Sequence, residues 1–262
     1  MITDIRTQRI DLDGVEVAYQ ESGTGRPLVC IHGNFASKRW FTEQLKAPPE
    51  GWRVLALDLP NFGDSDALGR DISIGAYADV LLEFVAALGL SPFALMGHSL
   101  GGGVAQVYAA RQPDTLLGLV LVAAAGPHGL VTPEERYMGL EMLKDNPDLM
   151  AGALEPTMPT GKPSYFDDIV EDAQKMVPDA FSGNARALAH YNVASALQAV
   201  TCPVLVVRGE HDYLVSAETA RETAAVFGGA RLELWNDIGH SPQIEDPERF
   251  NHLLAEFLKG AT

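Results

Sequence analysis

Apolar and polar residues alternate near the start of the chain, in two short runs at residues 10–12 and 15–19. Asp13-Gly14 separates the runs. Alternation with a period of two is typical of strands that are buried on one face, and Asp-Gly is favoured in tight hairpin turns. The pattern therefore predicts a sheet that begins with an antiparallel hairpin.

Short, continuously apolar runs follow, and they alternate with amphipathic segments. Strands covered on both faces have no polar face, so runs of this kind predict buried parallel strands. The expected strands of this kind are residues 28–31, 53–57, 93–96, 116–122 and 204–208, and a last strand is expected at residues 231–235. The expected helices are residues 36–45, 74–88, 100–111, 217–226 and 247–258. Together with the hairpin, this predicts an α/β fold with a mostly parallel eight-stranded sheet flanked by helices.

The alternation is interrupted in the middle of the chain. Residues 126 to about 194 are rich in Pro, Met and Asp and contain several short helix-like pieces without a convincing parallel strand. A chain of 262 residues suits one α/β domain with a large insertion. We therefore expect a core domain of residues 1–125 and 195–262, with residues 126–194 inserted as a helical cap.

Charge and composition narrow the possible partners. The formal net charge of -16 would repel a phosphate backbone, and no Lys/Arg cluster offsets it. The first residues are polar and acidic where a signal peptide needs an apolar run, and no stretch approaches the roughly 20 apolar residues of a membrane span. We expect a cytoplasmic protein with no nucleic-acid or membrane partner, in which Cys30 and Cys202 are small buried hydrophobes.

A candidate nucleophile lies in Gly97-His98-Ser99-Leu100-Gly101, directly after the expected strand 93–96 and at the start of the expected helix 100–111. A serine on so sharp a strand-to-helix turn requires glycine two residues before it and two residues after it, because strand and helix come very close together. An ordinary serine at a glycine-rich helix start is the alternative reading of this segment.

A serine hydroxyl is a weak nucleophile at neutral pH, so it needs a general base and a group that orients that base. His240 lies in the loop after the last expected strand, and Asp212 follows the strand 204–208. Taken alone, His240 could be a surface residue and Asp212 a turn residue. Ser99, Asp212 and His240 all fall at strand ends on one edge of the sheet, however, so together they predict a catalytic triad.

The chain resembles the α/β-hydrolase superfamily, which uses this order of Ser, Asp and His. The similarity is to its serine-nucleophile branch of small carboxylesterases, lactonases, cofactor-free haloperoxidase-like enzymes and meta-cleavage-product hydrolases. It extends to His32-Gly33-Asn34-Phe35, which resembles the family's oxyanion loop, and to the segment 58–65, which resembles the loop after its fourth strand. In the second match Asn61 stands where the family usually has Gly.

The resemblance implies that backbone N–H groups form an oxyanion hole. Its donors would be those of Asn34 and Leu100, with Phe35 the alternative if the loop is shifted by one residue. Such donors stabilise the negative charge that develops on the carbonyl oxygen in the transition state. His32 and His98 belong to the same loops and are interpreted as structural.

The sequence His32-Gly33-Asn34 also resembles the corresponding loop of the haloalkane dehalogenases, in which the asparagine side chain helps to hold halide. Those enzymes need an aspartate nucleophile, and Ser99 occupies that position here, which argues against dehalogenation. Motifs for other cofactors are not found in the sequence. Gly23-Thr24-Gly25 precedes a strand, whereas a dinucleotide-binding motif must follow one, and there is neither a Walker loop nor a His-Glu-x-x-His zinc pair. We therefore expect no cofactor and no metal.

The expected reaction is hydrolysis of a small carboxylic ester or lactone through an acyl-enzyme on Ser99. Asp212 is preferred over Glu210 as the acid that orients His240, because the family places it three residues after the glycine that ends the strand. An apolar pocket under the cap is expected to take the acyl group. Its candidate lining residues are Tyr137, Met138, Met142 and Phe166, with Met150 and Phe181 as further candidates, although residues of these types are more often cap core.

Other activities are possible on the same fold, because function resides in the site. One alternative class is a C–C bond hydrolase, a perhydrolase or a lyase. Another is a ligand receptor that turns over slowly. The partner expected in the main interpretation is a small-molecule ester or lactone, bound by a monomer or homodimer.

Overall fold

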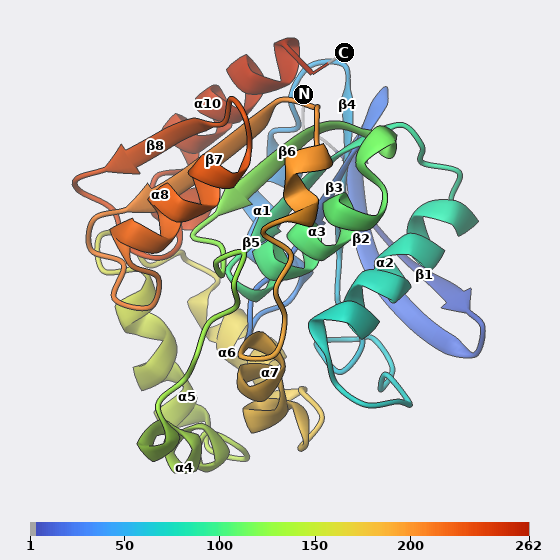
Figure 1. Ribbon diagram of the computed structural model, residues 1–262. Coiled ribbons are helices and arrows are strands. Elements are labelled where there is room, and N and C mark those ends of the chain that lie inside the picture. The colour runs from blue at the N-terminus through green and yellow to red at the C-terminus, as the bar shows by residue number, and fades with distance from the viewer. Residues whose placement is uncertain (1–3, 262) are drawn as a thin grey trace.

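The computed structural model describes residues 4–261 and is built around one eight-stranded sheet (Figure 1). The strands lie in the order β1-β2-β4-β3-β5-β6-β7-β8. β2 runs antiparallel to β1 and β4, and the other neighbouring strands are parallel. Their bounds are β1 (Arg6–Leu12), β2 (Val15–Gly23), β3 (Arg26–Ile31), β4 (Trp52–Leu57), β5 (Phe93–His98), β6 (Leu116–Val122), β7 (Val204–Gly209) and β8 (Arg231–Trp235).

Helices cover both faces of the sheet. α2 packs against α3 on one face, and α1 packs against α10 on the other, while α8 lies against β7 and β8 (Figure 1). The helices of the core are α1 (Thr42–Lys46), α2 (Ile74–Ala87), α3 (Leu100–Arg111), α8 (Ala217–Val226), α9 (Pro242–Glu245) and α10 (Pro247–Lys259). The predicted α/β architecture, a mostly parallel eight-stranded sheet flanked by helices, is confirmed.

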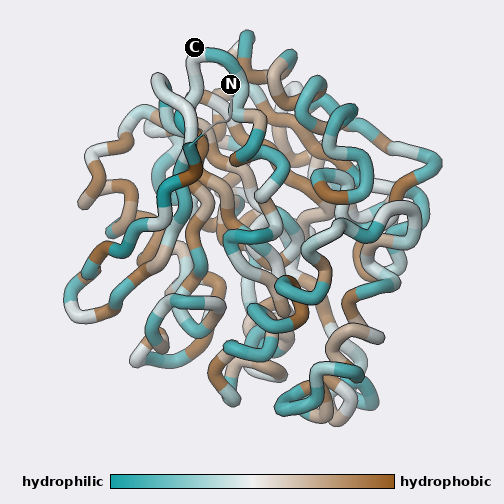
Figure 2. The backbone as a smooth tube through the Cα atoms, turned by 180° about the vertical axis from the view of Figure 1, so that it is seen from behind, coloured by the Kyte–Doolittle hydropathy of each residue, from teal (hydrophilic) through white to brown (hydrophobic). Residues whose placement is uncertain are grey.

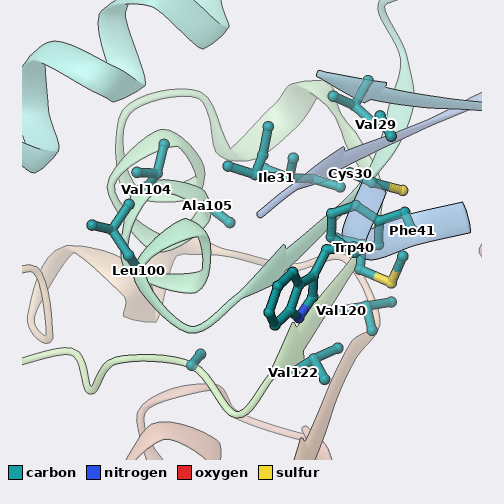
Figure 3. Packing of buried hydrophobic residues seen from close by; sticks show 14 of the residues in the cluster. Val29, Cys30, Ile31, Trp40, Phe41, Leu100, Val104, Ala105, Val120 and Val122 are labelled. Atoms are coloured by element: carbon teal, nitrogen blue, oxygen red, sulfur yellow. The ribbon is translucent and has the colours of Figure 1, made fainter. Parts of the chain in front are cut away.

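The central strands are apolar throughout because both of their faces are buried. Figure 3 shows Ile31 of β3 on the side of α3, near Ala105, whereas Cys30 lies on the side of Phe41. Hydrophobic residues gather along the strands inside the molecule, and hydrophilic residues are frequent in the outer helices and loops (Figure 2). Both cysteines are free thiols.

Residues 36–45, expected as one helix, form two shorter pieces. A 3-10 turn (Lys38–Phe41) precedes the five-residue helix α1. The carboxylate of Asp58 accepts hydrogen bonds from the backbone N–H of Lys38 at 2.6 Å and from its ammonium group at 2.7 Å, and Ser37 caps the turn. These bonds tie the start of the segment to the loop after β4, so tertiary contacts override the amphipathic pattern.

Four α-helices lie between β6 and β7, gathered at one end of the sheet (Figure 1). We refer to residues 126–194, which include them, as the cap segment. Polar contacts join it to the core: Arg39 donates to the carboxylate of Asp172, and Lys175 donates to Asp64. Its helices are α4 (Glu134–Met142), α5 (Pro147–Leu154), α6 (Phe166–Gln174) and α7 (Ala180–Leu188).

Candidate active site

Ser99 occupies the sharp turn between β5 and α3 with a left-handed backbone, at φ 53° and ψ -116°. A side chain is rarely accommodated in this conformation, and such strain is typical of functional sites. A Cβ atom on Gly97 would lie 2.4 Å from the carbonyl oxygen of Gly101, and a Cβ atom on Gly101 would lie 2.3 Å from that of Ile31. Both glycines are thus required by the close approach of α3 to β5 and β3.

Asp212 and His240 are directly joined. The carboxylate Oδ2 of Asp212 lies 2.8 Å from Nδ1 of His240, and both side chains are buried. The other oxygen, Oδ1, accepts the backbone N–H groups of Leu214 and Val215 at 2.8 and 2.9 Å. Since an ionised carboxylate can only accept, Nδ1 of His240 must carry the proton, and this leaves Nε2 as the basic nitrogen.

Asp212 is held in its charged form. Burial alone would raise its pKa, but the interactions with His240 and with the N–H groups of Val215 and Leu214 outweigh burial and hold the pKa below its ordinary value. The guanidinium of Arg208 donates to the backbone carbonyls of Asp212 and Val215 at 2.7 and 3.0 Å, which fixes the turn. Glu210, two residues earlier, is exposed to solvent.

The end of β7 brings this turn against the loop that carries His240. A Cβ atom on Gly209 would lie 2.2 Å from the carbonyl oxygen of Ile238 and 2.3 Å from that of Gly239. Glycine at position 209 therefore lets the two loops touch. Asp212 can reach His240 because of this contact.

Glu245, which the sequence did not single out, holds the loop on both sides of His240. Its carboxylate accepts the backbone N–H groups of Gly239 and Ser241, each at 3.0 Å to Oε1, and it also accepts the hydroxyl and N–H of Thr160 in the cap segment at 2.7 and 3.1 Å. The N–H of His240 itself donates to the carbonyl of Thr157 at 3.1 Å. One signal was readable: Glu245 follows a Ser-Pro helix start by one turn, one position beyond the acid of a capping box, which reaches back to the N–H of the cap residue.

The loop after β3 lies against Ser99. A Cβ atom on Gly33 would be 3.0 Å from Cβ of Ser99, so the next residue, Asn34, also lies close to the nucleophile. Within residues 4–261, the backbone N–H groups of Asn34 and Leu100 have no hydrogen-bond acceptor. The arrangement thus leaves both expected oxyanion donors free to bind a substrate oxygen.

Phe35, the alternative donor, has a left-handed backbone with φ 54°. His32 anchors the same loop, because its Nε2 accepts the N–H of Leu59 at 3.0 Å and its Nδ1 contacts the carbonyl of Gly33 at 2.8 Å. The loop after β3 is therefore held by the segment that follows β4.

His98 is buried beside His240, and the centroids of the two rings are 4.9 Å apart. Its Nε2 donates to the backbone carbonyl of His240 at 2.9 Å, and its ring stacks on Trp40. Burial, together with the proximity of His240, lowers the pKa of His98 to about 3. A neutral, hydrogen-bonded His98 supports the loop of His240, as expected of a structural histidine.

Ser99 and His240 line one cavity with a volume of about 240 Å³. The lining is mainly apolar and comes from the core and from the cap segment. Its residues are Asn34, Phe35, Trp40, His98, Ser99, Leu130, Val131, Thr132, Pro133, Arg136, Leu140, Leu143, Ala153, Leu154, Thr157, Ala185, Leu188, Tyr213, Leu214 and His240.

None of the four expected pocket residues lines this cavity, so that expectation needs correction. Met138 and Met142 are on the outer side of α4, with 76% and 58% of their surface exposed. Tyr137 stacks under the guanidinium of Arg186, and Phe166 is buried in the cap core. The cavity is lined instead by other residues of α4, such as Leu140, and by residues of α5 and α7. Helix rotation decides which face meets the core.

Neither a metal cluster nor a membrane-spanning helix is found in the part of the chain that the structure describes. Residues 4–261 contain no group of three or more His, Cys, Asp or Glu side chains that could hold a metal ion. No helix in the same range is long and apolar enough to cross a bilayer.

Residues 28–253 match the model of the alpha/beta hydrolase family. The chain belongs to this family. Among similar proteins, the non-heme chloroperoxidase CPO-A1 of Kitasatospora aureofaciens is 28% identical to this hydrolase, over 94% of this chain and 97% of that protein.

Solved structures of enzymes with ester and lactone chemistry resemble the hydrolase over almost its whole length. An esterase from Thermogutta terrifontis is 26% identical, with a TM-score of 0.79 over 98% of this chain and 100% of that one. Est816, described as an N-acyl homoserine lactone degrading enzyme, is 25% identical, with a TM-score of 0.79 over 95% and 100% of the two chains.

Proposed function

We propose that this protein is a cofactor-free serine hydrolase that cleaves a small carboxylic ester or lactone. The observation that carries the proposal is the bonded pair of His240 and Asp212 in one cavity with the strained Ser99. Esterases among the similar structures support the same class of reaction.

The chemistry follows from the protonation states. His240 accepts the hydroxyl proton of Ser99 on Nε2, and the Ser99 oxygen attacks the carbonyl carbon of the ester. The N–H groups of Asn34 and Leu100 stabilise the oxygen that becomes negative in the tetrahedral state. The protonated His240 then gives its proton to the departing alkoxide. The alcohol is released, and the acyl group remains bonded to the Ser99 oxygen as an acyl-enzyme.

Water completes the cycle by the same route. His240 takes a proton from water, the hydroxide attacks the acyl carbon, and the acid is released as the Ser99 oxygen is protonated again. Asp212 stabilises the imidazolium in both steps without taking its proton. In a lactone the departing alkoxide stays attached to the acyl group, so one hydroxy acid is released.

The cavity favours a small substrate with an apolar body. Its volume of about 240 Å³ is below the usual range of drug-sized pockets, and aliphatic and aromatic side chains dominate its lining. Among the described residues that line it, Arg136 is the one side chain with a permanent charge, and it is exposed to solvent. Short acyl chains or compact lactone rings fit this description best.

A substrate panel tests the proposal. Nitrophenyl esters of increasing acyl length and a matched series of lactones would be incubated with wild type and with Ser99→Ala. We expect turnover of short esters or lactones by wild type and none by the variant. If wild type turns over no member of either series, the ester and lactone proposal is wrong.

Perhydrolysis is a second candidate, favoured by the similarity to a chloroperoxidase. Hydrogen peroxide would take the place of water in attack on the acyl-enzyme, and a peracid would leave. Adding peroxide to an ester reaction and measuring peracid by its oxidation of bromide distinguishes the two. Acid alone as the product would exclude the second candidate.

A further inference from the structure

A line of four hydrogen bonds runs through the interior and ends at the oxyanion loop. The backbone N–H of Leu68 donates to Oδ1 of Asn61 at 2.7 Å, and Nδ2 of Asn61 donates to the hydroxyl of Tyr77 at 3.0 Å. The Tyr77 hydroxyl donates to Oδ1 of Asn184 at 2.7 Å, and Nδ2 of Asn184 donates to Oδ1 of Asn34 at 2.9 Å. We call Asn61, Tyr77 and Asn184 the relay.

The direction of every bond in the relay is determined by its first donor. A backbone N–H can only donate, so the atom of Asn61 that it meets must be the oxygen, and the other amide atom must be the nitrogen. Tyr77 has one hydroxyl proton, and because it accepts from Asn61 it must give that proton to an oxygen of Asn184. The same logic makes the atom of Asn34 next to Asn184 its oxygen.

The amide nitrogen of Asn34 is therefore the atom left over. Within residues 4–261 it has no hydrogen-bond acceptor, and Asn34 is a half-buried residue that lines the cavity together with Ser99 and His240. The relay is buried, with Tyr77 and Asn184 fully enclosed, so water cannot readily replace its bonds. Asn61 suits its place because asparagine tolerates the left-handed backbone found there, at φ 74°.

We propose that the side-chain amide of Asn34 donates a hydrogen bond to the carbonyl oxygen of the substrate, and that the relay keeps this amide in the donating orientation. The inference rests on the proposed ester hydrolysis. Asn34 would then give that oxygen two donors, its backbone N–H and its side chain. Asn184 is a positioning residue, since it acts through Asn34.

The side-chain donor would act mainly on the rate of the chemical step. The carbonyl oxygen carries full negative charge only in the tetrahedral state, so a donor to it stabilises that state more than the bound substrate. Asn34→Ala should lower kcat by about 10²-fold, the lower end of the loss known for one oxyanion donor, with KM little changed.

Two substitutions of Asn184 separate orientation from packing. Asn184→Asp keeps the shape and still accepts from Tyr77, but it cannot donate to Oδ1 of Asn34, so the Asn34 amide turns over and presents oxygen to the substrate. Asn184→Ala leaves that amide free to take either orientation. We therefore expect kcat to fall in the order wild type, Asn184→Ala, Asn184→Asp, although Asp is closer in shape to Asn.

Kinetics on one ester that wild type turns over, with thermal unfolding of each variant, would test the proposal. Asn251→Asp is a matched control, because this amide also donates and accepts but joins Glu43 and Gln44 away from the cavity. It should retain the wild-type kcat. If Asn184→Asp is at least as active as Asn184→Ala, or Asn34→Ala keeps its kcat, the proposal is wrong even though the ester reaction stands. Absence of wild-type turnover would instead refute the proposed function.

Discussion

Replacing Glu245 with alanine should slow catalysis, although Glu245 does not line the cavity. Its carboxylate holds four donors: the N–H groups of Gly239 and Ser241 on either side of His240, and the N–H and hydroxyl of Thr160. Hydrogen bonds to a charged group contribute about 1.5–3 kcal/mol each, but water can replace part of these at a half-buried site. A loss of about 2–3 kcal/mol in the free energy of unfolding is therefore expected.

The catalytic effect should be larger than the stability effect suggests. Without Glu245 the loop can shift, and a misplacement of about 1 Å in a catalytic group can reduce the rate by about 10²-fold. We expect Glu245→Ala to lower kcat by about 10–10²-fold while KM stays within about threefold of wild type. Glu245→Gln, which keeps one acceptor oxygen, should be intermediate.

Steady-state kinetics and urea unfolding on the same preparations would measure both effects. Glu248→Ala is the matched control, because Glu248 is an exposed glutamate three residues further along. Wild-type kcat in a folded Glu245→Ala variant would refute the positioning role. Equal losses in Glu245→Ala and Glu248→Ala would refute it as well.

Three further predictions concern the triad, pH and substrate size. Asp212→Asn should lower kcat by about 10⁴-fold, because it favours the wrong tautomer of the catalytic histidine, whereas Glu210→Gln should match wild type. Steady-state kinetics would show the reverse if Glu210 were the acid. The pKa of His98 is about 3 in the folded state and ordinary in the unfolded chain, so between about pH 6.5 and about pH 3 the unfolded chain binds a proton that the folded chain does not. The free energy of unfolding should therefore decrease as the pH falls through this range, by up to about 1.4 kcal/mol per pH unit. Urea titrations should show this slope flattened in His98→Gln, and an unchanged slope would exclude His98 as its source. Leu143→Ala and Leu154→Ala enlarge the cavity, so the preferred acyl chain in the nitrophenyl series should lengthen, and an unchanged preference would show that these side chains do not set substrate size.

The sequence predicted the sheet well because its signals are local. Continuous apolar runs mark buried strands, and the bounds expected for residues 116–122 are those of β6. The bounds expected for residues 231–235 are also those of β8, where Arg231 and Glu233 alternate with apolar residues at the edge of the sheet. Gly97 and Gly101 are a local signal as well. They indicate the close approach of α3 to the sheet, since a side chain at either position would collide with backbone atoms. The end of β7 placed Asp212, and not Glu210, beside His240.

Features that depend on distant contacts could not be predicted. The lining of the cavity depends on how α4 turns against the core, so Met138 and Leu140 could not be assigned to opposite sides from residue type alone. The relay joins Asn34 to Asn184, 150 residues away, through side chains that look unremarkable in sequence. The amphipathic pattern also misled at residues 36–45, where the bonds from Lys38 to Asp58 decide the conformation.

Covalent labelling of the nucleophile tests the central claim most directly. Wild type and Ser99→Ala would be incubated with a serine-directed phosphonate, and the adduct would be located by mass spectrometry of peptides. The account predicts one adduct per wild-type chain, on Ser99, and none on Ser99→Ala. An adduct on another residue of wild type, or equal labelling of the variant, would contradict the assignment of Ser99 as the nucleophile.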